Sequence, residues 1–411
     1  MKTIMTISAI AIFTLIGCGS DSSSPKAEEN NTTNNPPSHN NNTTKQCMDF
    51  VSLDKYFNSI VYVDFIDDTN GWVIGYNKTL GTHILLNTSD QGTTWNIINN
   101  DLKLDYGNGF IKGEPLKFVT ATNGFKLVRD KPNNTLLKLQ YTTDKGKTWT
   151  ALKNPFTDFR NQVLSIDRWM DYFDSNSKET LFYGSSYSNF LVLKVDNQTM
   201  KISFSQKISE DASITANIKS TTIGETYPVF SVSVKANSGG GFHLAEDGTI
   251  TSVVNAPIKD SFDTIAQMAQ STDNGETWKI MHSMKLTHLK TTSWVSDNVG
   301  YISGYDGNKN SYIYKTLDGG ETWSEKEAKE FQMMRFANSD NGIAVTDFDF
   351  YTTSNGGKTW QEIECKSADG QAVGGFDELL SYPSIGNGWI AGGKYSSDRL
   401  NRELGLYHYV K

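Results

Sequence analysis

Thr88-Ser89-Asp90-Gln91-Gly92-Thr93-Thr94-Trp95 is the stretch that decides the fold, because the same spacing returns at residues 142–149, 271–278, 316–323 and 353–360. The pattern is Ser or Thr, any residue, Asp, any residue, Gly, any residue, Thr and Trp. Five copies exclude coincidence and indicate a repeat protein. The fixed positions are Asp90, Gly92 and Trp95; Asp144, Gly146 and Trp149; Asp273, Gly275 and Trp278; Asp318, Gly320 and Trp323; and Asn355, Gly357 and Trp360, where Asn replaces Asp.

Each copy, called a box below, predicts a hairpin turn. The Asp carboxylate can accept local backbone N–H bonds, and the Gly can supply the positive φ that closes the turn. The Thr and Trp then begin the returning strand, and we expect the Trp to bury a large apolar area against a neighbouring sheet. The box residues are therefore predicted to be structural.

A second periodic signal alternates with the boxes, namely an Asn-Gly pair followed by an apolar residue. It occurs at residues 70–72, 123–125, 341–343 and 387–389, with a longer variant at 297–301. Asn-Gly between alternating hydrophobic residues predicts a hairpin. Each unit therefore reads as a four-stranded antiparallel blade, and blades that stack radially form an all-β propeller.

The blade count follows from the segments without a box. The gap between Asp144 and Asp273 is long enough to hide a boxless blade, for which residues 163–206 supply the strands. Residues 212–284 then form one enlarged blade that carries an extra hairpin at 241–250, and residues 376–411 form a closing blade. This count gives seven blades. An eight-bladed ring would need one unusually short blade.

The N-terminal residues indicate a targeting signal. Residues 1–17 have a single Lys and a short apolar run, the layout of a secretory signal, and end in Leu15-Ile16-Gly17 before Cys18. This ending resembles the lipobox of bacterial lipoproteins, which implies that Cys18 carries acyl chains that anchor the protein stably to a membrane. Gly19 after the Cys resembles the outer-membrane sorting pattern. An ordinary cleaved signal is the alternative.

Residues 18–46 are rich in Ser, Asn, Thr and Pro and cannot bury enough apolar surface to fold, so they predict a disordered linker. It would span on the order of 30 Å, at roughly 5–6 Å times the square root of its residue number. The propeller then occupies residues 47–411. Its two cysteines, Cys47 and Cys365, are expected to form a disulfide in an exported compartment and to hold the N-terminal strand beside the late blades; two separate buried thiols are the alternative.

Composition narrows the function. Lys and Arg number 38 against 46 Asp and Glu, a formal net charge of -8, which opposes nucleic-acid binding. With 6 His and 3 Cys the chain has no HExxH, paired CxxC, GxSxG or P-loop motif. We therefore predict no metal site and no cofactor. Spaced oxygen ligands from Asp171 to Glu179 fit a polar loop better than a Ca²⁺ loop.

The box is similar to the Asp-box, or BNR repeat. Boxes in a lipoprotein of this length resemble the propeller family of photosystem II assembly factors and their relatives in non-photosynthetic bacteria; sialidases, xyloglucanases and sortilin carry similar boxes. The resemblance covers residues 59–411. It implies a propeller whose boxes sit at the blade periphery and do not make the functional site.

The enzymatic members of this group have signatures that this chain does not match. A sialidase needs a clamp of three arginines, which lysines cannot replace, and the chain has six scattered Arg and no Arg-Ile-Pro motif. A xyloglucanase-like hydrolase needs two carboxylates about 5–10 Å apart across a cleft. Carboxylates such as Asp64, Asp67, Asp68, Asp347 and Asp349 are available, but one propeller supplies only half of that cleft. We predict that the protein is not an enzyme, with a glycosidase as the class kept open.

One segment has the composition of a contact surface. Residues 167–173 are dense in aromatic residues and contain an Arg, and Trp, Tyr and Arg dominate binding hot spots. Arg168, Trp169 and Tyr172 are therefore the candidate partner-binding residues, with a core-facing blade strand as the alternative. The sequence predicts a lipid-anchored, non-catalytic propeller in the bacterial envelope, on the outer membrane, that binds a protein or peptide. A carbohydrate-binding or glycan-cleaving propeller is the second interpretation.

Overall fold

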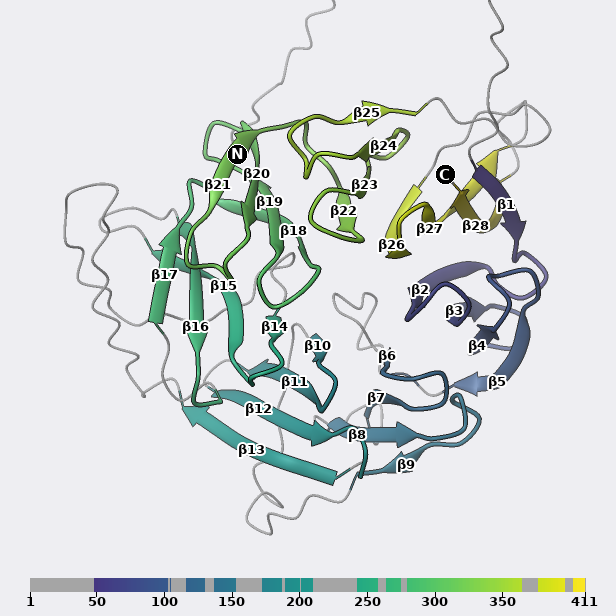
Figure 1. The fold of residues 1–411 in the computed structure, drawn as a ribbon. Coiled ribbons are helices and arrows are strands. Elements are labelled where there is room, and N and C mark those ends of the chain that lie inside the picture. The colour runs from purple at the N-terminus through teal and green to yellow at the C-terminus, as the bar shows by residue number, and fades with distance from the viewer. Residues whose placement is uncertain are drawn as a thin grey trace, which may run out of the picture. The chain divides into compact units, whose positions relative to one another are not determined.

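The computed structural model describes residues 48–102, 104, 116–129, 137–152, 172–186, 189–199, 201–209, 242–257, 264–274, 279–363, 376–395 and 402–410. Over these ranges the strands form seven four-stranded antiparallel sheets (Figure 1). The predicted seven-bladed propeller is confirmed. None of the described residues belongs to a helix long and apolar enough to cross a membrane.

Each blade is a meander whose first strand is innermost (Figure 1). The first strands contact one another between blades 1 and 7, 2 and 3, 3 and 4, 5 and 6, and 6 and 7. The strands of blades 1 to 3 are β2 (Ser59–Phe65), β3 (Gly71–Asn77), β4 (Thr82–Thr88) and β5 (Asn96–Leu102); β6 (Leu116–Phe118), β7 (Gly124–Arg129), β8 (Leu137–Thr142) and β9 (Thr150–Ala151); and β10 (Tyr172–Ser175), β11 (Glu179–Ser186), β12 (Asn189–Asp196) and β13 (Lys201–Ser209).

Blades 4 to 6 follow the same order, and blade 7 takes its outermost strand from the N-terminal end of the described chain. Their strands are β14 (Phe242–Leu244), β15 (Ile250–Pro257), β16 (Thr264–Ser271) and β17 (Lys279–Ser283); β18 (His288–Trp294), β19 (Gly300–Tyr305), β20 (Ser311–Thr316) and β21 (Ser324–Glu327); β22 (Met333–Phe336), β23 (Gly342–Val345), β24 (Phe350–Thr353) and β25 (Gln361–Glu362); and β26 (Phe376–Ser384), β27 (Asn387–Tyr395), β28 (Arg402–Val410) and β1 (Met48–Ser52).

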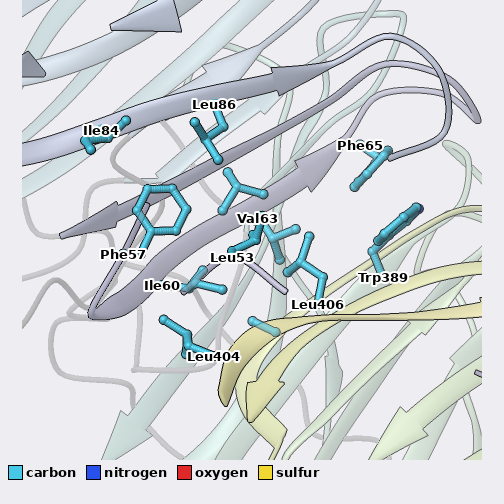
Figure 2. Packing of buried hydrophobic residues seen from close by; sticks show 12 residues of the cluster. Leu53, Phe57, Ile60, Val63, Phe65, Ile84, Leu86, Trp389, Leu404 and Leu406 are labelled. Carbon is cyan, nitrogen blue, oxygen red and sulfur yellow. The ribbon is translucent and has the colours of Figure 1, made fainter. Parts of the chain in front are cut away.

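The ring is closed by β1, which pairs antiparallel with β28, so that Met48 lies opposite Tyr409. This confirms that the two ends of the propeller share one blade. The seam between blades 7 and 1 is a buried apolar cluster, part of which is shown in Figure 2. In it the ring of Phe65 stacks on Trp389 with centroids 4.6 Å apart. Blades 1 and 2 are joined in the same way by Trp72 and Phe118, at 3.9 Å.

The boxless segments lie in the ring as expected, with one correction. Blade 3 is the predicted boxless blade, and blade 7 is the closing one. The hairpin expected as an addition to blade 4 is instead its first two strands, β14 and β15. Its turn uses Asp247, which accepts the backbone N–H of Thr249 at 2.8 Å, and Gly248 at φ 89°. Because this turn has neither an Asn-Gly pair nor a box, the sequence pattern did not mark it as a regular blade.

The glycines of the Asn-Gly pairs have a different role from the one expected. The turn between β2 and β3 precedes the glycine and is closed by Ile66 N–H donating to the carbonyl of Asn70 at 3.1 Å. Gly71 already belongs to β3, opposite Phe65. A Cβ added at Gly71 would come within 2.4 Å of the Phe65 ring. The glycine is required because an aromatic ring from the innermost strand lies flat over it.

The strand directions define two faces. Connections from first to second strand and the boxes, which join third to fourth strand, lie at one end of every blade, which we call the box face. Connections from second to third strand and between blades lie at the other end, the loop face. The longest connections, at residues 103–115, 152–171, 210–241 and 363–375, all join strand ends on the loop face.

Candidate functional site

The polar groups of each described box form hydrogen bonds within the same box. In the second box the hydroxyl of Thr142 donates to Asp144 Oδ1 at 2.7 Å and accepts the backbone N–H of Gly146 at 2.9 Å. The backbone N–H of Thr148 donates to Asp144 Oδ1 at 2.9 Å, and its hydroxyl to Oδ2 at 2.6 Å. Both carboxylate oxygens therefore serve the turn. The first and fourth boxes repeat these four bonds around Asp90 and Asp318.

The fifth box shows what the carboxylate contributes. Asn355 Oδ1 accepts the backbone N–H of Thr359 at 2.9 Å, as the Asp oxygen does elsewhere. Its amide nitrogen, however, donates to the hydroxyl of Thr359 at 2.8 Å, so this bond runs in the opposite direction. The turn therefore needs the shape of the side chain more than its charge.

Hydrogen bonding sets the acidity of the box aspartates. Bonds from the hydroxyl and backbone N–H of Thr94 and from the hydroxyl of Thr88 hold the pKa of Asp90 below its ordinary value. At Asp144 and Asp318 burial acts in the opposite direction, but the bonds from Thr148 and Thr322 outweigh it and lower each pKa. These carboxylates are ionised turn acceptors and are poorly suited to act as general acids.

The box tryptophans are partly buried and pack edge-on against the aromatic residue that ends the first strand of their own blade. Trp95 meets Phe65 at 89°, and Trp323 meets Trp294 at 87°. They belong to the clusters at the preceding seam, so the neighbouring sheet is the one before each box. Among the tryptophans that the structure describes, Trp72 and Trp389, which follow Asn-Gly pairs, are fully buried.

The box glycines also fit their predicted role. Gly92, Gly146, Gly320 and Gly357 all have positive φ, and a Cβ at Gly92 would come within 2.2 Å of Trp389 on blade 7. Trp149 and Trp360 pack like the other box tryptophans. In the third box Asp273 accepts the hydroxyl of Ser271 at 2.8 Å, whereas Gly275 and Trp278 lie outside the described residues.

A belt of polar side chains occupies one equivalent position on all seven innermost strands. On six of these strands it immediately precedes the residue that ends the strand; on β26, which ends at Ser384, it is Ser381, which lies opposite Trp389 as Asp64 lies opposite Trp72. The sequence analysis did not recognise this position. The inner belt consists of Asp64, Lys117, Asp174, His243, Ser293, Arg335 and Ser381. Aligning the seven turns would have revealed a polar residue at this position of every innermost strand.

Several members of the inner belt join neighbouring blades. Ser381 Oγ accepts the backbone N–H of Phe65 at 3.0 Å, and Ser293 Oγ accepts that of Phe336 at 3.1 Å. An innermost strand has an open edge, and these side chains satisfy N–H groups that the sheet leaves unpaired there. Lys117 and Asp64 make a 3.5 Å ion pair between blades 2 and 1.

His243 links three blades. Its Nδ1 lies 3.3 Å from Asp174 Oδ2 on blade 3, and its Nε2 lies 3.4 Å from Asp297 Oδ1 in the first turn of blade 5. The imidazole stacks on Trp294 at 4.6 Å. Asp174 Oδ2 also accepts the backbone N–H of Leu244 at 2.7 Å. The charged groups of the belt thus hold neighbouring blades together.

The carboxylates considered for hydrolysis do not converge. Asp64 lies in the inner belt, and Asp67 and Asp68 lie in a turn on the box face, where Asp67 accepts the N–H of Asn70 at 2.7 Å. Asp347 and Asp349 lie on the opposite, loop face of blade 6. The oxygen ligands considered for Ca²⁺ are used within the protein, since Asn176 Oδ1 accepts the N–H of Glu179 at 2.7 Å. The described residues contain no group of three or more His, Cys, Asp or Glu arranged to hold a metal.

Several predicted sites fall wholly or partly outside the described residues. Cys18, Arg168 and Trp169 lie outside them, while Tyr172 opens β10 at the loop face. Cys47 and Cys365 also lie outside, so their pairing stays a prediction. Their described neighbours are at opposite ends of adjacent blades: Met48 is on the box face, and Ile363, whose N–H donates to Phe350, is on the loop face.

Within the described part of the loop face, two large apolar side chains that the sequence analysis did not single out are exposed. Phe348, in the turn between β23 and β24, is 69% exposed, and Leu80, in the corresponding turn of blade 1, is 60% exposed. Another feature of this face is His288, which is exposed and stacks on Tyr305 at 4.6 Å. Beside it Lys290 pairs with Glu330 at 3.0 Å.

Comparison with known proteins identifies the fold alone. No protein-family model matches the chain, and no curated protein matches it in sequence. YCF48 from Cyanidioschyzon merolae is similar in structure, with a TM-score of 0.50 and 13% identity over 88% of this chain and 99% of that one. The β-propeller domain of the Trilobed protease from Pyrococcus furiosus has a TM-score of 0.51 and 8% identity over 85% of this chain and 95% of that one.

A GH74 xyloglucanase from Xanthomonas campestris is more loosely similar, with a TM-score of 0.48 and 12% identity over 88% of this chain and 56% of that one. The Pyrococcus propeller is described as having an open velcro topology. In the present chain the outermost strand of blade 7 comes from the other end of the propeller. At these identities the likeness concerns architecture, and the chain is by fold a closed seven-bladed β-propeller.

Proposed function

We propose that this protein is a membrane-anchored, non-catalytic propeller that binds a protein or peptide partner through its loop face. The observation that carries the proposal is the different use of polar groups and connections on the two faces. On the box face the Asp, Thr and Gly groups of the described boxes are taken up by their own turns. The longest connections belong to the loop face, as do Phe348 and Leu80, whereas the exposed Leu317 and Ile385 belong to the box face. In repeat folds, long insertions on one face often mark the binding face.

The position of β1 supports the choice of the loop face as the binding face. The chain enters the propeller at Met48, on the box face. A linker that begins at Cys18 would therefore join the propeller on the box face, at the opposite end of the blades from the loop-face turns. An outer-membrane anchor of this kind suits a factor that helps to assemble or maintain an envelope complex, in keeping with the resemblance of its boxes to those of the assembly-factor propellers.

A glycan-binding propeller is the second candidate, and one observation favours it. His288 and Tyr305 form a flat aromatic pair beside the Lys290–Glu330 ion pair on the loop face. Aromatic surfaces flanked by a few placed polar groups are typical of small-ligand sites.

Two measurements on the same protein separate the candidates. The first is chemical crosslinking in intact envelopes followed by purification of the full chain, and the second is a glycan array probed with residues 47–411. We expect a reproducible protein adduct and no glycan binding. Glycan binding without a protein adduct would reverse the order of the two proposals.

A further inference from the structure

Two turns on the loop face present an apolar side chain at a fixed position. In the blade 6 turn Thr346 N–H donates to the carbonyl of Asp349 at 3.0 Å, and Asp349 N–H donates to the hydroxyl of Thr346 at 3.0 Å. The turn is thus closed on both sides, and Phe348 projects from it. A turn whose backbone is already fixed loses less conformational entropy on binding than a mobile loop.

The blade 1 turn is built on the same plan. Asn77 Oδ1 accepts the N–H of Leu80 at 2.9 Å, and its carbonyl accepts the N–H of Gly81 at 2.9 Å. The amide nitrogen of Asn77 donates to the carbonyl of Tyr56 at 2.8 Å, which fixes the turn to the connection between blades 7 and 1. Leu80 therefore projects from a second preformed turn on the same face.

The tips of these two turns, at Phe348 on blade 6 and Leu80 on blade 1, differ in the charge of the side chains around them. Asp347 is exposed next to Phe348, and the neighbouring Asp349 is occupied by Lys329, at 3.5 Å. Near Leu80 the exposed charged side chains are Lys78, on the same turn, and Lys55, on the connection that Asn77 holds. Asp54, which is also exposed on that connection, accepts the backbone N–H of Leu404 at 2.6 Å. The blade 6 tip is thus flanked by an acidic group and the blade 1 tip by basic groups.

Blade 7 lies between the two tips. Face-to-face sheets pack about 10 Å apart, so two seams separate the tips by roughly 20 Å, which an extended segment covers with about six residues at ~3.3 Å each. A partner that fits both tips must present apolar side chains at this separation. It must also carry a basic group over blade 6 and an acidic group over blade 1.

We propose that Phe348 and Leu80 are the two anchors of a docking surface across blades 6, 7 and 1. Its occupant is a segment of a partner protein with apolar residues between a basic end, over Asp347, and an acidic end, over Lys78 and Lys55. This inference rests on the proposed function and specifies which sector of the loop face makes the contact. Aromatic residues at fixed positions are the usual binding hot spots.

The test uses a photoactivatable amino acid, p-benzoylphenylalanine, placed singly in the full chain in intact cells. The test positions are Phe348 and Leu80. The matched controls are Leu317 and Ile385, which are also exposed, at 61% and 50%, but lie on the box face. Lys309, at the corresponding turn of blade 5, reports on the rest of the loop face.

We expect light-dependent adducts with one and the same protein from positions 348 and 80, and none from the box-face controls. Mapped by mass spectrometry, the crosslinked segment should have an acidic residue near the position 80 adduct and a basic residue near the position 348 adduct. A synthetic peptide of that segment should bind the full chain about tenfold more weakly after Phe348→Ala. It should also lose affinity after Asp347→Lys, whereas Leu317→Ala should change nothing.

The other outcomes are decisive. Protein adducts from position 309 alone would overturn this docking surface but leave the proposed function standing. Adducts of the chain with itself would assign the surface to a second copy. The absence of a protein adduct from every loop-face position would contradict the docking surface and the proposed function together.

Discussion

The aromatic side chains that lie over strand glycines allow a quantitative prediction at the seam between blades 7 and 1. Phe65 is 4% exposed and contacts Trp389 face-on and Trp95 edge-on. Phe65→Ala should lower the free energy of unfolding by about 3–5 kcal/mol, the usual loss for a buried Phe. Gly71→Ala should lower it by about 1–3 kcal/mol, because the new Cβ would come within 2.4 Å of the Phe65 ring and overpack the site.

The two changes should not add. Once Phe65 is Ala, the atoms that the Cβ at position 71 would meet are gone, so the double mutant should be more stable than the sum predicts by about 1–3 kcal/mol. The control is Phe65→Ala combined with Gly342→Ala. Gly342 lies under Phe336 on blade 6, at 2.6 Å for the added Cβ, and does not share the ring of Phe65. That pair should be additive within about 0.5 kcal/mol.

The assay is equilibrium unfolding in urea, followed by far-ultraviolet circular dichroism, on residues 47–411 for the parent and the five variants. Additive losses for Phe65 and Gly71 would show that the ring does not occupy the space above the glycine. Steric demand from the aromatic ring would then be the wrong explanation of the Asn-Gly pairs.

Three further predictions concern the boxes and the anchor. The lowered pKa of Asp90 means that the carboxylate adds stability above its unfolded pKa, about 3.9, and that this stability is lost as the pH falls. Asp90→Asn should therefore flatten the acid side of a curve of unfolding free energy against pH, and Asn355→Asp should steepen it. Unchanged curves would contradict this prediction. Asp144→Ala removes three turn bonds and should cost about 1–2 kcal/mol in urea unfolding, whereas Asp144→Asn should cost less, as the fifth box indicates. Cys18→Ala should release the protein from the membrane fraction and abolish labelling by a palmitate analogue; continued labelling would contradict the lipobox interpretation.

The fold could be predicted from sequence because its turns are chemically distinctive. A box needs an acceptor side chain, a glycine with positive φ and a hydroxyl at fixed spacing, so each copy can be recognised without knowing what surrounds it. Blade 4 shows the limit of this approach. Its first turn, around Asp247 and Gly248, satisfies the same backbone groups with a different sequence, and the hairpin was therefore mistaken for an addition to the blade.

The role of the Asn-Gly pairs was misassigned for a related reason. A dipeptide pattern reports local conformational freedom, and Asn-Gly is typical of tight hairpin turns. In this protein Gly71, Gly124 and Gly342 are selected by what lies across the strand, since each is paired with an aromatic residue six positions earlier. That requirement depends on the pairing register, which a local motif does not contain.

The inner belt was missed because its members share a position and not a chemistry. Ser381 and Ser293 accept a backbone N–H of the next blade, Lys117 pairs with a carboxylate, and Arg335 donates to Thr291 at 3.1 Å. What the position requires is any polar group able to satisfy the open edge of an innermost strand. A motif search looks for recurring residue types and therefore passes over such a position.

The same reasoning explains why the proposed docking surface is the least predictable part of the protein. Box and belt residues are constrained by the backbone of their own chain, so their partners are present in the sequence. Phe348 and Leu80 are constrained by nothing within the described chain except the turns that hold them. Their exposure contributes nothing to folding, and burying such side chains against a partner is favourable by roughly 25 cal/mol per Å². Leu317 and Ile385 are exposed to a similar degree on the box face, and single exposed apolar residues are common on protein surfaces. The proposed contact therefore depends on the fixed turns that present Phe348 and Leu80 and on the charges beside them, and exposure alone does not identify it.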